Sequence, residues 1–151
     1  MRHRISAAGV VLRGNQLLMV RHRQPGAYDF WVPPGGGLEG HESILQAAER
    51  EVHEETGLKV GAERILYLQE LADAESRICK SFVLCHEVGG ALSRAHLVDD
   101  ESDTLVEARF MTSSQMAALD VRPPVFRDEF WQDLRREDRG IRHLGLTVCD
   151  N

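Results

Sequence analysis

Residues 36–58, GGLEGHESILQAAEREVHEETGL, are the stretch of this chain that decides the fold. Two prolines and a glycine precede it, so the run of glycines at its start predicts a tight loop. Ser43 lies three residues before Gln46, which is the spacing of a capping box that opens a helix. Gly57 is the typical left-handed residue that ends one. We therefore expect a helix from about Ser43 to Thr56.

The glutamates of this helix gather on its inward side. The apolar residues spaced by three and four form the inward stripe, namely Ile44, Ala47, Ala48 and Val52. Glu51 and Glu55 fall on the same side, and Glu54 lies beside them. Two like charges about 4 Å apart repel by roughly 4 kcal/mol at an effective dielectric constant near 20. Such a cluster needs a cation, and oxygen ligands favour Mg²⁺ or Mn²⁺. The alternative is an acidic face in solvent.

The spacing of the whole stretch resembles the Nudix box. Five residues separate Gly36 from Glu42, and seven more separate Glu42 from the run REVHEETGL at 50–58. Every fixed position of the box is filled. The resemblance implies an α+β fold, an α/β/α sandwich with a central mixed sheet, the box helix and a C-terminal helix. It also implies a single hydrolase domain over residues 1–151.

The rest of the chain has the order of elements that this resemblance implies. Apolar and alternating runs predict strands at residues 5–12, 16–23, 30–32, 59–70, 78–88 and 106–111. Helices are expected at 114–119 and 125–136. Residues 137–151 have no counterpart in the family pattern, and 140–148 predict an extra C-terminal strand. That strand either covers an edge of the sheet or pairs across a homodimer.

Composition narrows the classes of partner. The chain has 151 residues, a hydrophobic content of 42% and a formal net charge of −6. Acidic charge argues against a long nucleic acid as partner, whereas a divalent ion could bring in a small nucleotide. No apolar run approaches the ~20 residues of a membrane span. The three cysteines lack zinc-site spacing, and no secretory signal opens the chain, so we expect a cytoplasmic protein with reduced thiols.

The resemblance implies hydrolysis of a nucleoside diphosphate linked to another moiety, with Mg²⁺ as cofactor. Motifs typical of other substrate subclasses are missing, which favours a MutT-like nucleoside triphosphate pyrophosphohydrolase. An ADP-ribose or nucleotide-sugar pyrophosphatase is the alternative within the enzymes. A domain that senses nucleotides without catalysis is the alternative of another class, although such domains usually lose box glutamates.

The resemblance also assigns roles by position in the box. Glu51, Glu54 and Glu55 are the implied metal ligands, and one of the last two is the implied general base. Arg50 has an orienting role through Glu51. The metal site is completed by Glu42 and by the carbonyl group of Gly35, where a glycine lets the backbone approach an ion.

Family members often add an acidic residue from a loop beyond the box, as metal ligand or base. The candidates in this chain are Asp99, Asp100, Glu101, Asp103 and Glu107, of which we favour Glu101. The alternative is that this loop is simply solvated.

Three residues are candidates for substrate binding. Arg21 and Arg23 lie at the end of the second expected strand and could bind phosphates, or could be a charged strand end. Trp31, just before the glycines, could stack on a base or belong to the core.

Overall fold

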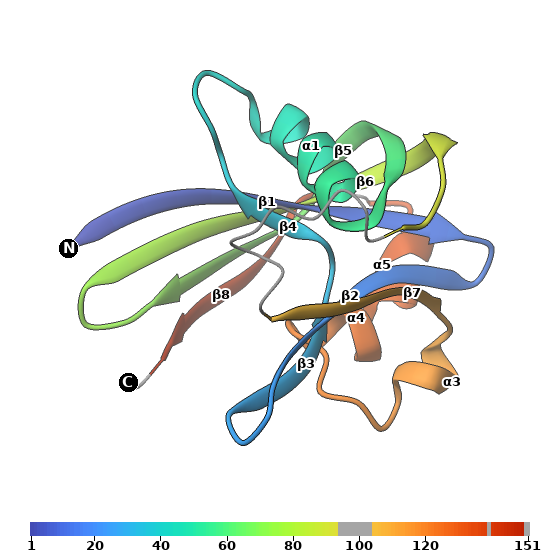
Figure 1. Cartoon of the computed structure of the whole chain (residues 1–151). Coiled ribbons are helices and arrows are strands. Elements are labelled where there is room, and N and C mark those ends of the chain that lie inside the picture. Colours follow the sequence, from blue (N-terminus) through green and yellow to red (C-terminus); the bar gives the residue numbers. More distant parts are fainter. Residues whose placement is uncertain (94–103, 139, 150–151) are drawn as a thin grey trace.

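The structure, a computed structural model, describes residues 1–93, 104–138 and 140–149 (Figure 1). Its strands are β1 (Arg2–Arg13), β2 (Gln16–Gln24), β3 (Tyr28–Val32), β4 (Gly35–Gly37), β5 (Leu58–Ala72), β6 (Ser76–Gly90), β7 (Leu105–Met111) and β8 (Arg142–Val148). Its helices are α1 (Ile44–Thr56), α3 (Ser113–Met116), α4 (Val125–Asp128) and α5 (Phe130–Arg135).

The strands form one mixed sheet with the order β3-β2-β1-β6-β5-β8, to which β4 adds on β1 and β7 adds on β2. β1 is parallel to β6 and β5 is parallel to β8, while β1 and β2 are antiparallel. β1 and β2 pair only next to their turn, from Leu12 with Leu17 to Arg13 with Gln16. Farther along the same edge of β1, Ser6 to Ala8 pair with the glycines of β4 instead. The glycines at the start of the box are therefore hydrogen-bonded to β1, a central strand of the sheet.

Each face of the sheet carries its own core, because side chains alternate along a strand. Ala7 and Val11 of β1 belong to the core that includes Val52 of α1. Ala8 and Val10 belong to the opposite core, which contains Phe126 of α4 and Phe130 of α5. Figure 1 shows α1 on one side of the sheet and the C-terminal helices on the other. The expected α/β/α sandwich with a mixed sheet is confirmed.

Gly9 allows helix α1 to lie close to the sheet. A Cβ atom at Gly9 would collide with the side chain of Val52 and would approach the carbonyl oxygen of Ala48 to 3.6 Å. The Gly9 amide also donates to the carbonyl of Pro34 at 2.8 Å. The box helix and the segment before it are thus both positioned against the same point of β1.

Three elements differ from the expectation or extend it. The prediction of one helix over 125–136 was wrong, because Glu129 at φ −119° separates α4 from α5. Phe126, Phe130 and Leu134 keep a spacing of four residues across α4 and α5, so the apolar pattern does not reveal the break. The glycine loop contains a three-residue strand, β4. The C-terminal strand β8 pairs with β5 of the same chain, from Tyr67–Arg142 to Ala72–Val148. In the described residues, no helix is long and apolar enough to cross a membrane.

Candidate active site

Helix α1 begins and ends as the sequence predicts. The Ser43 hydroxyl accepts from the Gln46 amide at 3.1 Å, and the Gln46 side chain accepts from the Ser43 amide at 2.8 Å. Gly57 ends the helix in the left-handed conformation, with φ 83°. Local hydrogen bonds close both ends, so they set which residues the helix contains.

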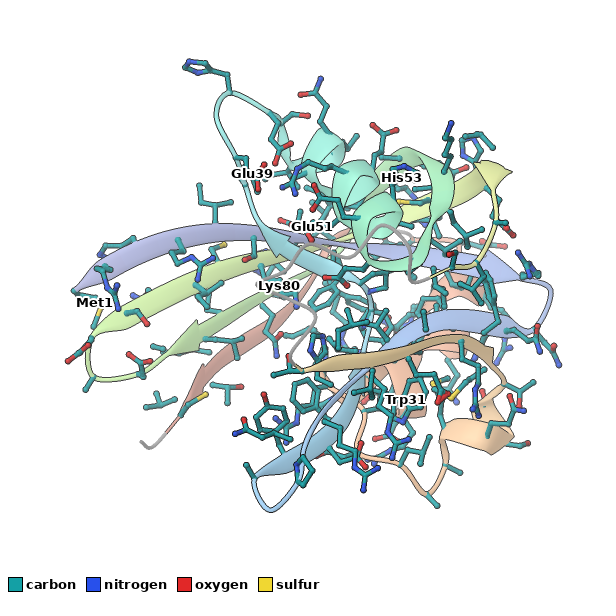
Figure 2. The ribbon with its side chains drawn as sticks, in the orientation of Figure 1. Met1, Trp31, Glu39, Glu51, His53 and Lys80 are labelled. Carbon is teal, nitrogen blue, oxygen red and sulfur yellow. The ribbon has the colours of Figure 1, made fainter. Side chains whose placement is uncertain are left out.

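Two of the three clustered glutamates are buried under the helix. Glu51 is 3% exposed and Glu55 is 2% exposed, whereas Glu54 is half-buried. Figure 2 shows Glu51 on the side of α1 that faces the sheet. Buried carboxylates of like charge are costly without a compensating cation. The expectation that Glu51 and Glu55 continue the inward side of the helix is confirmed.

Gly36 makes room for the carboxylate of Glu51. A Cβ atom at Gly36 would lie 2.5 Å from Oε1 and 2.8 Å from Cδ of Glu51. Any side chain at this position would therefore push the carboxylate away from β4. The first glycine of the box is thus required by a side chain that lies fifteen residues later in the sequence.

Arg50 is the centre of the hydrogen bonds in the box. Its Nη1 donates to Oε1 of Glu51 at 2.9 Å and to Oε2 of Glu54 at 3.0 Å. Its Nη2 donates to Oε1 of Glu42 at 2.7 Å and to the carbonyl of Gly37 at 3.0 Å. Arg50 therefore ties the two ends of the box to each other, and the pairing with Glu51 agrees with the orienting role that remains its predicted function.

These hydrogen bonds also shift the pKa values of the groups involved. The hydrogen bonds from Arg50 hold the pKa of Glu42 below its usual value, and the amide of Glu39 adds to this effect. The same carboxylates raise the pKa of Arg50, with Glu42 as the largest cause. Glu42 and Arg50 are therefore both charged at neutral pH.

The donor atoms at this site suit a hard divalent cation. Carboxylates of Glu51, Glu54 and Glu55 and the carbonyl of Gly35 supply oxygen only, which is the chemistry that Mg²⁺ and Mn²⁺ prefer. Gly36 leaves the space that Glu51 needs. In the described part of the chain, no three acidic, histidine or cysteine side chains are already grouped to hold a metal. Arg50 instead holds one oxygen each of Glu51 and Glu54.

A cavity of about 550 Å³ opens beside this site, with Gly35 at its edge. His22, Phe30 and Val32 line it from β2 and β3, and the rings of His22 and Phe30 stack with centroids 5.4 Å apart. The guanidinium carbon of Arg122 lies 4.1 Å from the centroid of Phe30. A cavity of this size, largely apolar with a few polar groups, is typical of small-molecule sites.

The opposite side of the cavity comes from the long strands of the sheet. Gln69 and Leu71 of β5 and Lys80 of β6 line it there. Thr147 of β8 and the following Cys149 complete this side, next to Leu71, with which Thr147 is in register. The C-terminal strand therefore contributes directly to the cavity.

The three residues predicted to bind substrate do not line this cavity. Arg21 forms two hydrogen bonds with Asp29, at 2.8 and 2.6 Å, and Arg23 lies 3.9 Å from the same carboxylate. Trp31 is 5% exposed and belongs to the core on the side of Phe126 (Figure 2). The ion pairs of the two arginines match the charged strand end that was the alternative.

The acidic residues expected from the loop divide into two groups. Glu101, the favoured candidate, lies outside the described residues together with Asp99, Asp100 and Asp103. Glu107 lies on β7 and accepts a hydrogen bond from Arg109 at 2.6 Å.

Sequence reasoning missed Lys80, Arg122 and Thr147. Lys80 carried a usable signal, since it is the only charged residue of the largely apolar run 78–85 and falls on the same face as Phe82, two residues later. Arg122 and Thr147 carried none, because they come from a loop and from a strand outside the family pattern.

A family model described as the NUDIX domain matches residues 2–130 of this chain. The chain is similar to the 8-oxo-dGDP phosphatase of Danio rerio, with 37% identity over 87 residues, which are 58% of this chain and 26% of that protein. It is also similar to an RNA pyrophosphohydrolase of Cellvibrio japonicus, with 44% identity over 50 residues, 33% of this chain and 29% of that protein. The matches thus span less than a third of these two relatives.

Solved structures resemble the whole fold. A NUDIX hydrolase from Nitrosomonas europaea superposes with a TM-score of 0.71 and 23% identity, covering 89% of this chain and 92% of that one. An ADP-ribose pyrophosphatase from Streptococcus suis gives a TM-score of 0.68 and 18% identity, covering 93% and 98%. At these identities the likeness establishes the fold.

Proposed function

The chain belongs to the NUDIX family, and on that premise we propose that it hydrolyses a pyrophosphate bond in a small nucleotide with Mg²⁺ or Mn²⁺ as cofactor. The observation that carries the proposal is the adjacency of two glycines. Gly35 borders the cavity, and Gly36 lies against the carboxylate of Glu51. A nucleotide in the cavity would therefore have its phosphates next to the box glutamates.

The residues proposed to hold the metal are Glu51, Glu54 and Glu55, with the carbonyl of Gly35 and with Glu42 at the periphery. A divalent ion there would neutralise the charge of the phosphates and lower the pKa of a water molecule. Family members generally use a divalent metal, and the oxygen-only donor set of this chain fits one.

The protein's own groups have three tasks in this proposal. Glu54 or Glu55 accepts a proton from the attacking water. Arg50 holds Glu51 and Glu54 in place through hydrogen bonds of 2.9 and 3.0 Å. The cavity binds the nucleoside and excludes water from part of the substrate.

The proposed substrate is a nucleoside triphosphate, as in the MutT-like group, and ADP-ribose or a nucleotide sugar is the second candidate. The name of the relative from Danio rerio supports a nucleotide, and that of the Streptococcus suis structure supports ADP-ribose. Because other relatives are named RNA pyrophosphohydrolase, RNA with a 5′-triphosphate also belongs among the substrates to be tested.

The test is a substrate panel with Mg²⁺, read by chromatography, with Glu54→Gln as the blank. It contains nucleoside triphosphates with normal and oxidised bases, ADP-ribose, nucleotide sugars, dinucleoside polyphosphates and triphosphorylated RNA. Release of pyrophosphate from a nucleoside triphosphate supports the first candidate, and conversion of ADP-ribose to AMP supports the second. Tight binding of one nucleotide without turnover would instead support a nucleotide-sensing domain.

Compartment, domain content and assembly belong to the same proposal. Three free thiols, Cys79, Cys85 and Cys149, support a reducing compartment such as the cytoplasm. One hydrolase domain over residues 1–151 is supported by the single sheet that runs from β1 to β8. A homodimer would use the outer edge of β8, the last strand of the described sheet; a light-scattering mass equal to the monomer would exclude it.

A further inference from the structure

Lys80 lies where the cavity meets the box glutamates. It belongs to β6, in register with Ser6 of β1 on one side and Gln69 of β5 on the other. It lines the cavity together with Gly35, and its Nζ atom lies 5.2 Å from the centroid of the Phe82 ring. In the view of Figure 2, Lys80 lies on the sheet below Glu51. The Lys80 side chain thus lies on the face of the sheet that carries Phe82 and lines the cavity there.

Lys80 lines the cavity without forming an ion pair with a carboxylate among the described residues. Burial lowers the pKa of Lys80, and the negative charges of Glu55 and Glu51 act against this shift. Among the described residues that line the cavity there is no aspartate or glutamate. Within the part of the chain that the structure describes, the ion pairs closer than 4.0 Å do not include Lys80. Arg122, the other basic residue with a long side chain at the cavity, already pairs with Asp120 at 2.9 Å.

We propose that Lys80 binds a non-bridging oxygen of the substrate phosphate that is attached to the nucleoside. This inference rests on the proposed function. The nucleoside would occupy the cavity and the scissile bond would lie at the box glutamates, so the phosphate between them passes Lys80. A lysine ammonium is a compact charge with three donors and no acceptor, which suits a phosphate oxygen.

A purely structural role for Lys80 makes a different prediction. If Lys80 only offsets the charges of Glu51 and Glu55, its removal destabilises the protein and leaves the preference for phosphate unchanged. If it binds phosphate, its removal weakens the binding of nucleoside monophosphates and leaves the binding of nucleosides unchanged. Comparing a nucleotide with its own nucleoside separates the two roles without requiring turnover.

The experiment uses calorimetry with GMP against guanosine, AMP against adenosine and UMP against uridine, with and without Mg²⁺. In the wild type at least one monophosphate is expected to bind more tightly than its nucleoside. Lys80→Met should lower that preference by about tenfold, the size expected for one charge-assisted hydrogen bond, and Lys80→Arg should restore part of it. Lys59, the only other lysine of the chain, is exposed and gives the matched control Lys59→Met.

Nuclear magnetic resonance provides a second measurement on the wild-type protein, in case Lys80→Met does not fold. Labelling lysine with ¹³C gives only two side-chain signals, because the chain has two lysines. The Lys80 signal should shift with a monophosphate and much less with its nucleoside, while the Lys59 signal stays in place. The same phosphate preference in wild type and Lys80→Met, or equal shifts with both ligands, would overturn the inference. If Lys80→Met loses the phosphate preference but the wild type hydrolyses none of the substrates in the panel, the proposed hydrolase is overturned and the role of Lys80 stands.

Discussion

Gly36 and the carboxylate of Glu51 are in such close contact that a Cβ atom at Gly36 would lie 2.5 Å from Oε1 of Glu51. The glycine belongs to β4, which pairs with Ala7 in the middle of β1, and the glutamate belongs to α1. Neither element has room to withdraw, since α1 packs on β1 at Gly9. The position of a buried carboxylate is therefore decided by the absence of a side chain on a neighbouring strand.

The first prediction follows from this contact. Gly36→Ala should displace Glu51 and lower kcat by about a hundredfold, because a shift near 1 Å at a reacting centre can cost that much. Thermal melting followed by circular dichroism checks that the variant still folds. Gly89→Ala is the matched control, because a Cβ atom at Gly89 would have no other atom within 4 Å. Equal activity of the two variants would contradict the proposed role of Glu51 as a metal ligand.

The second prediction concerns Glu54, which is less buried than its neighbours. Glu54→Gln keeps the shape of the side chain and removes its charge, so turnover should fall by orders of magnitude while the fold is retained. Circular dichroism melting and steady-state kinetics measure the two effects. Glu63→Gln, on β5 and paired with His86 at 3.2 Å, serves as control. Near-normal turnover with a matched melting curve would remove Glu54 from the site.

The third prediction concerns removal of the metal. A chelator should abolish turnover, and Mg²⁺ should restore it. Binding of an ion to the folded state alone also raises its stability, so Mg²⁺ should raise the melting temperature of the chelated protein. Glu51→Gln should reduce that rise, since Glu51 is one of the proposed ligands. Turnover that is insensitive to chelator would indicate a different chemistry.

The fourth prediction is a pH dependence of stability that arises at Glu42. Hydrogen bonds from Arg50 lower the pKa of Glu42 in the folded state, whereas the unfolded chain has the ordinary value of about 4.3. The stabilisation is therefore present above about pH 4.3 and is lost as the pH falls through the lower, folded-state pKa. Urea unfolding between pH 7 and pH 3 should show Glu42→Gln less stable at pH 7, with a shallower acid decline. Parallel curves for both proteins would exclude Glu42 as a source of the acid dependence.

The fifth prediction uses the three thiols. Cys79 and Cys149 are exposed and should react with a thiol reagent in the native protein. Cys85 should not react, because burial raises its pKa to about 12. Cys149 lines the cavity, so a bound nucleotide should slow its labelling, while Cys79 serves as the internal control. Mass spectrometry of labelled peptides measures all three rates, and equal slowing at Cys79 would mean that the effect does not come from the cavity.

The box helix could be predicted almost to the residue, because its signals are local. The capping box of Ser43 with Gln46, the terminator Gly57 and the spacing of the glutamates all act within a few residues. The helix also carries most of the proposed metal ligands. This part of the proposed site could therefore be predicted from the sequence before the fold was known.

The cavity could not be predicted in the same way, because its residues come from distant segments. Trp31 and Phe30 are neighbours in sequence, but alternation along β3 sends Trp31 into the core and Phe30 to the cavity. Arg122 reaches Phe30 from the loop before α4. The charged residues that stood out in the sequence, Arg21 and Arg23, are instead paired with Asp29.

By itself, the sequence determined the family, the box helix and the oxygen-rich chemistry of Glu51, Glu54 and Glu55, since these depend on spacing along one helix. Only the tertiary structure decided which side of that helix meets Gly36, and which strands supply Lys80 and Thr147 to the cavity. The reason is physical: hydrogen bonds between neighbours in sequence fix a helix, whereas the pairing of β8 with β5 and of β4 with β1 depends on strands far apart in the chain.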